Sequence, residues 1–276
     1  MQEVSIPAPA AAVEANINAQ VPLLYAHMPG VEAIDEPGLL GVMSDLPDLR
    51  LNSIYWASFP SQPEQVEARI DRVLARYRAR GQPPMTWVVS PSTQPRDLGR
   101  YLATRGLTCA FRGVPGMALD LEAFVEPRTT PAALSIERVG DLQTLKKWLH
   151  PVAVSFDFQD PIISAHLAMF SSQGFGLVGV SGSAVPWQLF VGLDKGEPVA
   201  ASCLFCAAGV AGIYHVATLP EARGQGFGTA MTLAALRAGQ DLGYRIAILT
   251  ASGEGYDLYR RLGFRTVAQA DIYRRT

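Results

Sequence analysis

Cysteine is scarce in this chain, with three residues in 276. So small and odd a number cannot form the disulfide framework of secreted domains. Cys203 and Cys206 make a single CxxC pair inside an apolar segment. Because a second pair and nearby histidines are lacking, a four-ligand zinc site is disfavoured, and no metal is expected. Two small residues on a buried strand are the simpler interpretation.

An excess of charge of one sign is also lacking. The chain has 23 basic and 25 acidic residues, a formal net charge of −2. A nucleic-acid-binding protein needs a basic face, and a membrane-surface protein needs a run of like charge. The sequence has neither feature, so no nucleic-acid partner and no membrane partner are expected.

A long, uninterrupted hydrophobic run is absent as well. Residues 198–220 hold a single acidic or basic side chain, His215, and are long enough to span a membrane. Proline bounds the segment at both ends, however, and Ala207-Ala208-Gly209 interrupts it. Two buried strands joined by a tight turn are therefore expected. The N-terminus lacks the basic and apolar regions of a secretory signal, so the cytoplasm is the expected location.

What the chain does have is enough apolar sequence for a sizeable core, at 49% hydrophobic residues. At about 150 residues per domain, its length suggests two domains. The second half follows a regular order of elements, read from hydrophobic periodicity. We expect strands over residues 134–139, 187–193, 199–206, 212–218, 245–250 and 265–273, and helices from 141, over 161–171, from 227 to about 243 and over 255–262.

The first half ends in the same order: strand, long helix, strand, short helix, strand. We expect these elements at residues 39–43 and 54–59 (strands), 64–80 (helix), 85–89 (strand), 97–105 (helix) and 117–121 (the end of a last strand). The repeated order indicates a diverged internal duplication. The proline-rich segment 127–131 is the best linker, which predicts domains at 1–126 and 133–276 joined by residues 127–132. The fold class is α/β (α+β).

The clearest chemical signal follows the predicted strand at 212–218. We call residues 223–229, with the sequence Arg-Gly-Gln-Gly-Phe-Gly-Thr, the glycine turn. It opens a predicted helix, whose N-terminus offers free N–H groups and a partial positive charge. Glycine lets the backbone approach a ligand closely, and Arg223 adds a full charge. The segment predicts an anion site, most naturally for phosphate or pyrophosphate.

Three ligand classes compete for this site. A nucleotide P-loop needs lysine and then serine or threonine after the last glycine, and Phe227-Gly228-Thr229 has no lysine. A dinucleotide site of the Rossmann type needs an acidic residue at the end of the next strand, where residues 249–252 have none. The third class is the pyrophosphate of coenzyme A.

Two motifs at this spacing carry a family resemblance. Arg223-x-x-Gly226-x-Gly228 after a strand, followed by Leu-Tyr-Arg-Arg-Leu-Gly-Phe at residues 258–264, resembles the GNAT superfamily of N-acyltransferases. The resemblance covers residues 134–276, and the first half is similar to a degenerate copy. It implies two tandem GNAT-like domains, each a mixed, largely antiparallel sheet flanked by helices. It also implies transfer of an acyl group, with acetyl-CoA as donor, to a primary amine by direct attack.

The same resemblance implies roles for individual residues. Tyr259 falls where members often have a tyrosine beside the thioester sulfur, and its phenol would protonate the leaving thiolate. Ser252 stands where many members have an asparagine that contacts the cofactor. The backbone at the end of the strand would pair with the pantetheine arm, and the glycine turn would hold the pyrophosphate. These cofactor-binding positions are Val216, Ala217, Thr218, Arg223, Gly224, Gln225, Gly226, Phe227, Gly228 and Thr229.

The general base is less clear. Many members supply a glutamate on the strand before the glycine turn, and residues 212–215 contain none. His215 is the nearby titratable group, with a second interpretation as a satisfied histidine on a half-buried strand. Asp157 and Asp160 would line the acceptor side or be solvated loop carboxylates. The first half lacks the glycine turn, and Leu102 stands at the position equivalent to Tyr259, which predicts one active site per chain.

The acceptor is left open by the sequence: a small-molecule amine and a protein amine both fit. A monomer and a homodimer are also both open. Two other functions compete with the enzyme. One is a non-catalytic acyl-CoA-binding sensor or scaffold, which the missing glutamate favours and Tyr259 disfavours. The other is a nucleotide-binding protein, weakened by the absent lysine and acidic residue.

Overall fold

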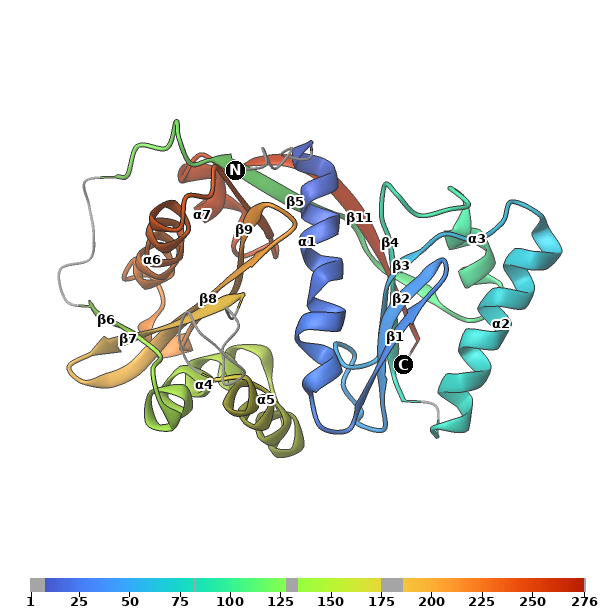
Figure 1. The fold of residues 1–276 in the computed structure, drawn as a ribbon, viewed down its shortest axis with the longest axis horizontal. Helices are drawn as coiled ribbons and strands as arrows, with labels where there is room; N and C mark the ends of the chain where they lie inside the picture. The colour runs from blue at the N-terminus through green and yellow to red at the C-terminus, as the bar shows by residue number, and fades with distance from the viewer. Residues whose placement is uncertain (1–7, 82, 128–133, 175–185, 276) are drawn as a thin grey trace. The chain divides into compact units, whose positions relative to one another are not determined.

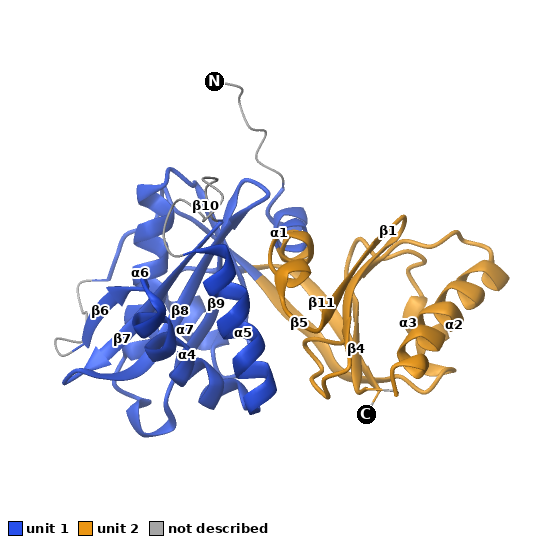
Figure 2. Ribbon diagram, turned by 60° about the horizontal axis from the view of Figure 1, so that its bottom comes forward, with its two compact units in different colours: residues 1–16, 117–265 blue, residues 17–116, 266–276 orange. Residues whose placement is uncertain are grey.

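The computed structural model describes residues 8–81, 83–127, 134–174 and 186–275. The chain forms two compact units, coloured separately in Figure 2. Unit 1 consists of residues 1–16 and 117–265, and unit 2 of residues 17–116 and 266–276. Helix α1 (Pro9–Leu23) and strand β5 (Thr108–Asp120) each contribute to both units.

Unit 1 is built on a mixed sheet in the order β5-β10-β9-β8-β7-β6, to which β5 contributes its last residues. Strands β9 and β10 are parallel, while β6, β7, β8 and β9 pair antiparallel in sequence. Helices α4 and α6 both pack on β7, β8 and β9, from opposite faces in Figure 1. The elements are β6 (Leu134–Arg138), α4 (Leu142–Phe156), α5 (Asp160–Gln173), β7 (Trp187–Asp194), β8 (Glu197–Ala207), β9 (Val210–Thr218), α6 (Phe227–Asp241), β10 (Ile246–Thr250) and α7 (Tyr256–Arg261).

Local sequence accounts for the helices that cover this sheet. Helix α4 begins at a capping box, in which Thr144 N donates to Asp141 Oδ1 over 2.7 Å. Its buried side chains, which include Leu145 and Trp148, recur at helical spacing and face the sheet. Helix α6 buries a stripe of small and apolar residues that ends in Leu236 and Gly239. Helix α6 and the sheet enclose a hydrophobic core that includes Leu204 of β8 and Leu236 of α6.

In unit 2 the strand order is β1-β2-β3-β4-β11-β5, to which β5 contributes its first residues. Strands β3 and β4 are parallel, and the pairs β1–β2, β2–β3 and β4–β11 are antiparallel. Its core lies between the sheet and helix α2, around Ile70 and Trp87. The elements are η1 (Tyr25–His27), β1 (Val31–Glu36), β2 (Leu39–Ser44), β3 (Ser53–Ala57), α2 (Pro63–Ala79), β4 (Met85–Val89), α3 (Leu98–Ala103) and β11 (Arg265–Arg275).

The predicted fold class, a mixed α/β fold with largely antiparallel strands flanked by helices, is confirmed. Residues 198–220 form β8 and β9, as expected from the interrupted apolar pattern. Within the described ranges, no helix combines the length and the hydrophobicity that a membrane span requires. Helix α1 and strand β1 have no counterpart among the predicted elements.

The compact units do not follow the predicted copies. Strand β11, assigned by sequence to the second copy, pairs with β4 of unit 2 from Asp271–Val89 to Arg275–Met85. In turn, residues 117–127 lie in unit 1. Periodicity identifies a strand but not the edge that it joins, because that choice depends on residues far away in the chain. The division into 1–126 and 133–276 stays a prediction about the ancestral copies, and its linker lies, except for residue 127, outside the described residues.

Candidate active site

The glycine turn forms the entrance of α6. After β9 and one turn of 3₁₀ helix, η2 (Pro220–Ala222), the chain reaches Gly224 and Gly226, whose φ angles of 76° and 81° are left-handed. Glycine adopts this region without steric cost. Gly226 is the N-cap of α6, and none of the described side chains caps the helix there. The amides of the first turn of α6 follow an exposed loop, so their N–H groups could donate to an anion.

Arg223 is held beside this loop without being buried. Its Nε donates to the Thr218 carbonyl over 3.3 Å, and its Nη1 lies 3.7 Å from Glu254 Oε2. The side chains of Arg223 and Glu254 are 51% and 85% exposed, so solvent weakens this ion pair. The hydrogen bond to Thr218 therefore orients Arg223 along the end of β9. Because its ion pair with Glu254 is weak, the guanidinium could instead pair with a bound anion.

Tyr259 sits on α7 in a mostly buried position, 9% exposed. Its ring meets Phe264 edge to face, with centroids 5.9 Å apart. Gly255 makes room for it, because a Cβ there would lie 2.8 Å from Tyr259 Cε2. Burial raises the pKa of Tyr259 to about 12, so the phenol keeps its proton at neutral pH. Ser252 begins the turn into this helix, and its Oγ accepts from Gly255 N over 3.3 Å.

Strand β9 carries a β-bulge at His215. Cys203 faces Tyr214, while Ala201 faces Ala217, so one residue of β8 opposes two of β9. His215 has a φ of 49°, a left-handed conformation that is strained for a side chain of this kind. A bulge redirects side chains, and it turns His215 toward the rings of α4 and α5.

Aromatic rings surround His215. The rings of Trp148, Phe156 and His166 meet it edge to face, with centroids 5.6, 5.9 and 6.5 Å away. His166 Nδ1 lies 2.8 Å from the Ile162 carbonyl oxygen. Because a carbonyl only accepts, Nδ1 carries the hydrogen of a neutral His166. The ring of His215 is thus packed on several sides, and both interpretations of this residue, a general base and a satisfied histidine on a half-buried strand, stay predictions.

The edge of β9 next to β10 changes along its length. The two strands pair at Ala211–Ala247 and Gly212–Ile248 and part from there, before the bulge. Among the backbone groups expected to meet a pantetheine arm, Thr218 O already accepts from Arg223 Nε at 3.3 Å and from Ser155 Oγ at 3.4 Å. Val216 and Thr218 are half-buried, while Ala217 is buried.

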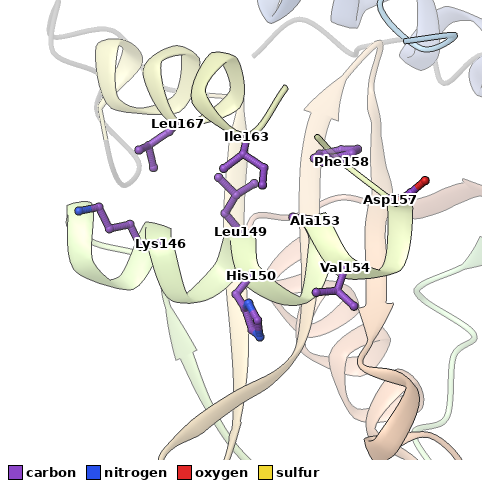
Figure 3. Close-up of a pocket in the computed structure, with 9 residues that line it drawn as sticks. All are labelled: Lys146, Leu149, His150, Ala153, Val154, Asp157, Phe158, Ile163 and Leu167. Atoms are coloured by element: carbon purple, nitrogen blue, oxygen red, sulfur yellow. The ribbon is translucent and has the colours of Figure 1, made fainter. Parts of the chain in front are cut away.

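A hollow of about 650 Å³ lies between α4 and α5. Figure 3 shows Leu149 of α4 and Ile163 of α5 pointing toward each other inside it. Asp157, the left-handed C-cap of α4, lies at one end, and Phe158 lines the wall. The ring of Phe158 also stacks on His166 at 4.6 Å. Asp157 and Asp160 are both exposed, as expected for solvated loop carboxylates, and a place on the acceptor side stays a prediction.

Sequence reasoning missed several residues near the bulge. His166 looks like any polar residue on an amphipathic helix, and Trp148 and Phe156 look like core residues. The bulge depends on the pairing of β8 with β9, which local sequence does not encode. The sequence around His166 offers no specific signal for its contact with His215.

Comparisons with known proteins agree with this geometry. Residues 186–266 match the family model of the acetyltransferase (GNAT) domain. No curated protein matches the chain in sequence.

Several solved structures share the fold over nearly the whole chain. A GCN5-related N-acetyltransferase from Kribbella flavida is 20% identical, with 96% of this chain and 95% of that chain covered and a TM-score of 0.69. One from Sphaerobacter thermophilus is 16% identical (98% and 94% covered, TM-score 0.60). A tandem GNAT protein from the clavulanic acid biosynthesis pathway is 14% identical (90% and 84% covered, TM-score 0.62). At these identities the likeness shows the fold.

The residues that match the family model include the candidate active site. Residues 186–266 contain β9, the glycine turn, α6 and Tyr259. The solved structures extend the fold to both units, and one of them is itself a tandem protein. Residues 186–266 therefore carry an acetyltransferase domain of the GNAT type, a family whose members transfer acyl groups from acyl-CoA and use acetyl-CoA as co-substrate, and the rest of the chain shares the fold of the solved structures.

Proposed function

We propose that this protein is an N-acyltransferase that moves the acetyl group of acetyl-CoA to a primary amine by direct attack on the thioester. The observation that carries the proposal is the glycine turn: two left-handed glycines lead from β9 into the uncapped N-terminus of α6. Such a turn supports binding of a pyrophosphate through backbone amides. Amides from Gly224 to Thr229 would hold it, with Arg223 adding charge.

The pantetheine arm would run along the part of β9 that has left β10. Two extended chains can pair there through backbone hydrogen bonds, as in strand addition. Because Thr218 O already accepts from Arg223 and Ser155, we place the main bonds at Val216. Pyrophosphate binding would draw Arg223 away and free one acceptor position on Thr218. Ser252, at the turn after β10, would contact the cofactor from the other side.

The reaction needs two proton transfers, and we assign each to a different side chain. The attacking amine must lose a proton, and His215 is the group that would take it, on the bulge beside the pantetheine edge. A bond then forms between the amine nitrogen and the acyl carbon, and the carbon–sulfur bond breaks. Tyr259 would give its proton to the departing sulfur. A pKa of about 12 supports this role, because the phenol holds a proton to give at neutral pH.

The two neighbouring cysteines support direct attack over a covalent acyl-enzyme. Burial raises the pKa of Cys206 to about 11 and that of Cys203 further still. A thiol acts as a nucleophile in its thiolate form, so neither residue is activated at neutral pH.

The test begins with isothermal titration of acetyl-CoA and of free coenzyme A. We expect both to bind, and the double variant Arg223→Ala/Gly226→Asp to abolish binding. Release of the coenzyme A thiol is then followed with panels of small amines and of peptides with free amino groups. Binding without turnover on any amine would favour an acyl-CoA-binding sensor. No binding at all would overturn the proposal.

A further inference from the structure

Asn16 of α1 is completely buried in unit 1, at 0% exposure. Its side chain reaches the turn that joins β8 to β9. Nδ2 lies 2.9 Å from the Ala207 carbonyl oxygen, 3.3 Å from that of Phe205 and 3.5 Å from that of Val210. Its Oδ1 accepts from the Tyr214 hydroxyl over 2.7 Å. One amide therefore ties both strands of the hairpin to α1.

The fit around this amide is close. A Cβ at Gly212 would lie 2.3 Å from Asn16 Oδ1, so glycine is required for the amide to lie against β9. Buried carbonyls left without a donor cost about 1–3 kcal/mol each. A leucine of similar size would fill the space but leave these carbonyls and the Tyr214 hydroxyl without the bonds that Asn16 supplies. The site thus requires a hydrogen-bonding amide, and an apolar side chain of the same size would not replace it.

Tyr214 immediately precedes His215, the residue with the strained backbone. A left-handed conformation of this kind costs about 1–3 kcal/mol and persists only where the surrounding structure enforces it. On one side, the rings of Trp148, Phe156 and His166 pack on His215. Opposite the bulge, the Ser202 carbonyl accepts from Trp148 Nε1 over 2.9 Å. On the other side, the Tyr214–Asn16 bond anchors the residue before the bulge.

We propose that Asn16 is a positioning residue for the acyl transfer, acting through Tyr214 to hold the bulge that presents His215. The inference rests on the proposed function, in which His215 takes the proton of the amine. It makes residues 9–16 a working part of unit 1, although the sequence assigns them to the first predicted domain, residues 1–126. Displacement of a reacting group by about 1 Å can cost 100-fold in rate, so a small shift of the bulge is enough to matter.

Unit 2 provides a matched control in Asn52, which is also 0% exposed. Its Nδ2 donates to the carbonyls of Leu46 and Asp48 over 2.7 and 3.0 Å, and its Oδ1 accepts from Ser44 N over 2.9 Å. Asn16→Ala and Asn52→Ala therefore remove the same amide and a similar set of bonds. We expect both to lower Tm by a similar number of degrees, since each leaves buried backbone groups unsatisfied.

The test measures kcat, KM for the acceptor amine and Kd for acetyl-CoA below both melting transitions. Asn16→Ala should lower kcat by about tenfold with Kd for acetyl-CoA unchanged, while Asn52→Ala keeps the wild-type kcat. Equal kcat values for the two variants would overturn the inference. If Asn16→Ala does not fold, Tyr214→Phe removes the hydrogen bond from the Tyr214 hydroxyl to Asn16 Oδ1. We then expect about a threefold loss of kcat, and an unchanged kcat would overturn the inference. Failure of the wild type to turn over any amine would instead count against the proposed function.

Discussion

The two units contain the same pair of parting strands but differ in what lies beside them. In unit 1, β9 and β10 pair at two positions and then separate. In unit 2, β3 and β4 pair at Ser53–Thr86 and Ile54–Trp87 and also separate. Beyond that point Gln94 lies against β3: its N–H donates to Ala57 O, and its carbonyl accepts from Phe59 N, both over 3.0 Å. The bridge between Ser58 and Gln94 is parallel, as between two strands.

In unit 2, Gln94 thus occupies the edge of β3 beyond its pairing with β4. The corresponding edge of β9 in unit 1 is where we propose that the cofactor binds. The segment after β3 in unit 2 also has prolines and serine where unit 1 has the glycine turn, and Leu102 is buried in the core where unit 1 has Tyr259. An edge strand needs partners for its backbone groups, and a neighbouring loop supplies them as well as a ligand does. Local differences of this kind are therefore enough to remove, from one unit, the features on which the ligand proposed for the other depends.

We expect the largest effect, on acetyl-CoA affinity, from a glycine-to-aspartate substitution in unit 1, compared with the same substitution in unit 2. Gly226 and Gly106 both have left-handed φ angles, of 81° and 82°. Aspartate tolerates this region and is a good N-cap, so Gly226→Asp should fold. Its carboxylate would repel the pyrophosphate, and we expect acetyl-CoA affinity to fall by at least about 100-fold, or 2.7 kcal/mol. Gly106→Asp should leave it unchanged. Equal affinities in calorimetry would place the cofactor elsewhere.

The next effect concerns the base. His215→Asn keeps a residue that tolerates the left-handed bulge but removes the imidazole. Because general bases contribute 100-fold or more, we expect kcat to fall about 100-fold, with Kd for acetyl-CoA unchanged. The comparison is His27→Asn, a histidine of η1 in unit 2, which should keep the wild-type kcat. An unchanged kcat in His215→Asn would return His215 to the role of a packed core residue.

The features behind these tests differ in how far the sequence could predict them. The glycine turn was readable because its function lies in consecutive residues with a required backbone conformation. Asn16 was not, because it bonds to residues 189 to 198 positions away. The strain at His215 depends on the register of two strands, and the partner of β11 depends on which edge is open in unit 2. Local signals predict elements and turns; contacts between distant residues decide how they combine.

Tyr259→Phe should have a smaller effect on turnover. A coenzyme A thiolate is a weak base, with a thiol pKa near 8.5, so it leaves without much help, and we expect kcat to fall about tenfold. Because the phenol pKa is about 12, wild-type kcat should show no alkaline decline from this group up to pH 10. Tyr77→Phe, at a buried tyrosine of unit 2, should leave kcat unaffected. A wild-type kcat in Tyr259→Phe would exclude the phenol as the proton donor.

The smallest effect should come from loosening the segment that fills unit 2. Thr93 is 1% exposed, and its Oγ1 accepts from Ser90 N over 2.9 Å, which closes the turn just before Gln94. Thr93→Ala should destabilise the protein by about 1 kcal/mol through loss of this bond. Titration should still give one acetyl-CoA per chain with unchanged Kd, because unit 2 also lacks the glycine turn that would hold the pyrophosphate. A second binding event in Thr93→Ala would mean that the filled edge alone keeps the cofactor out of unit 2.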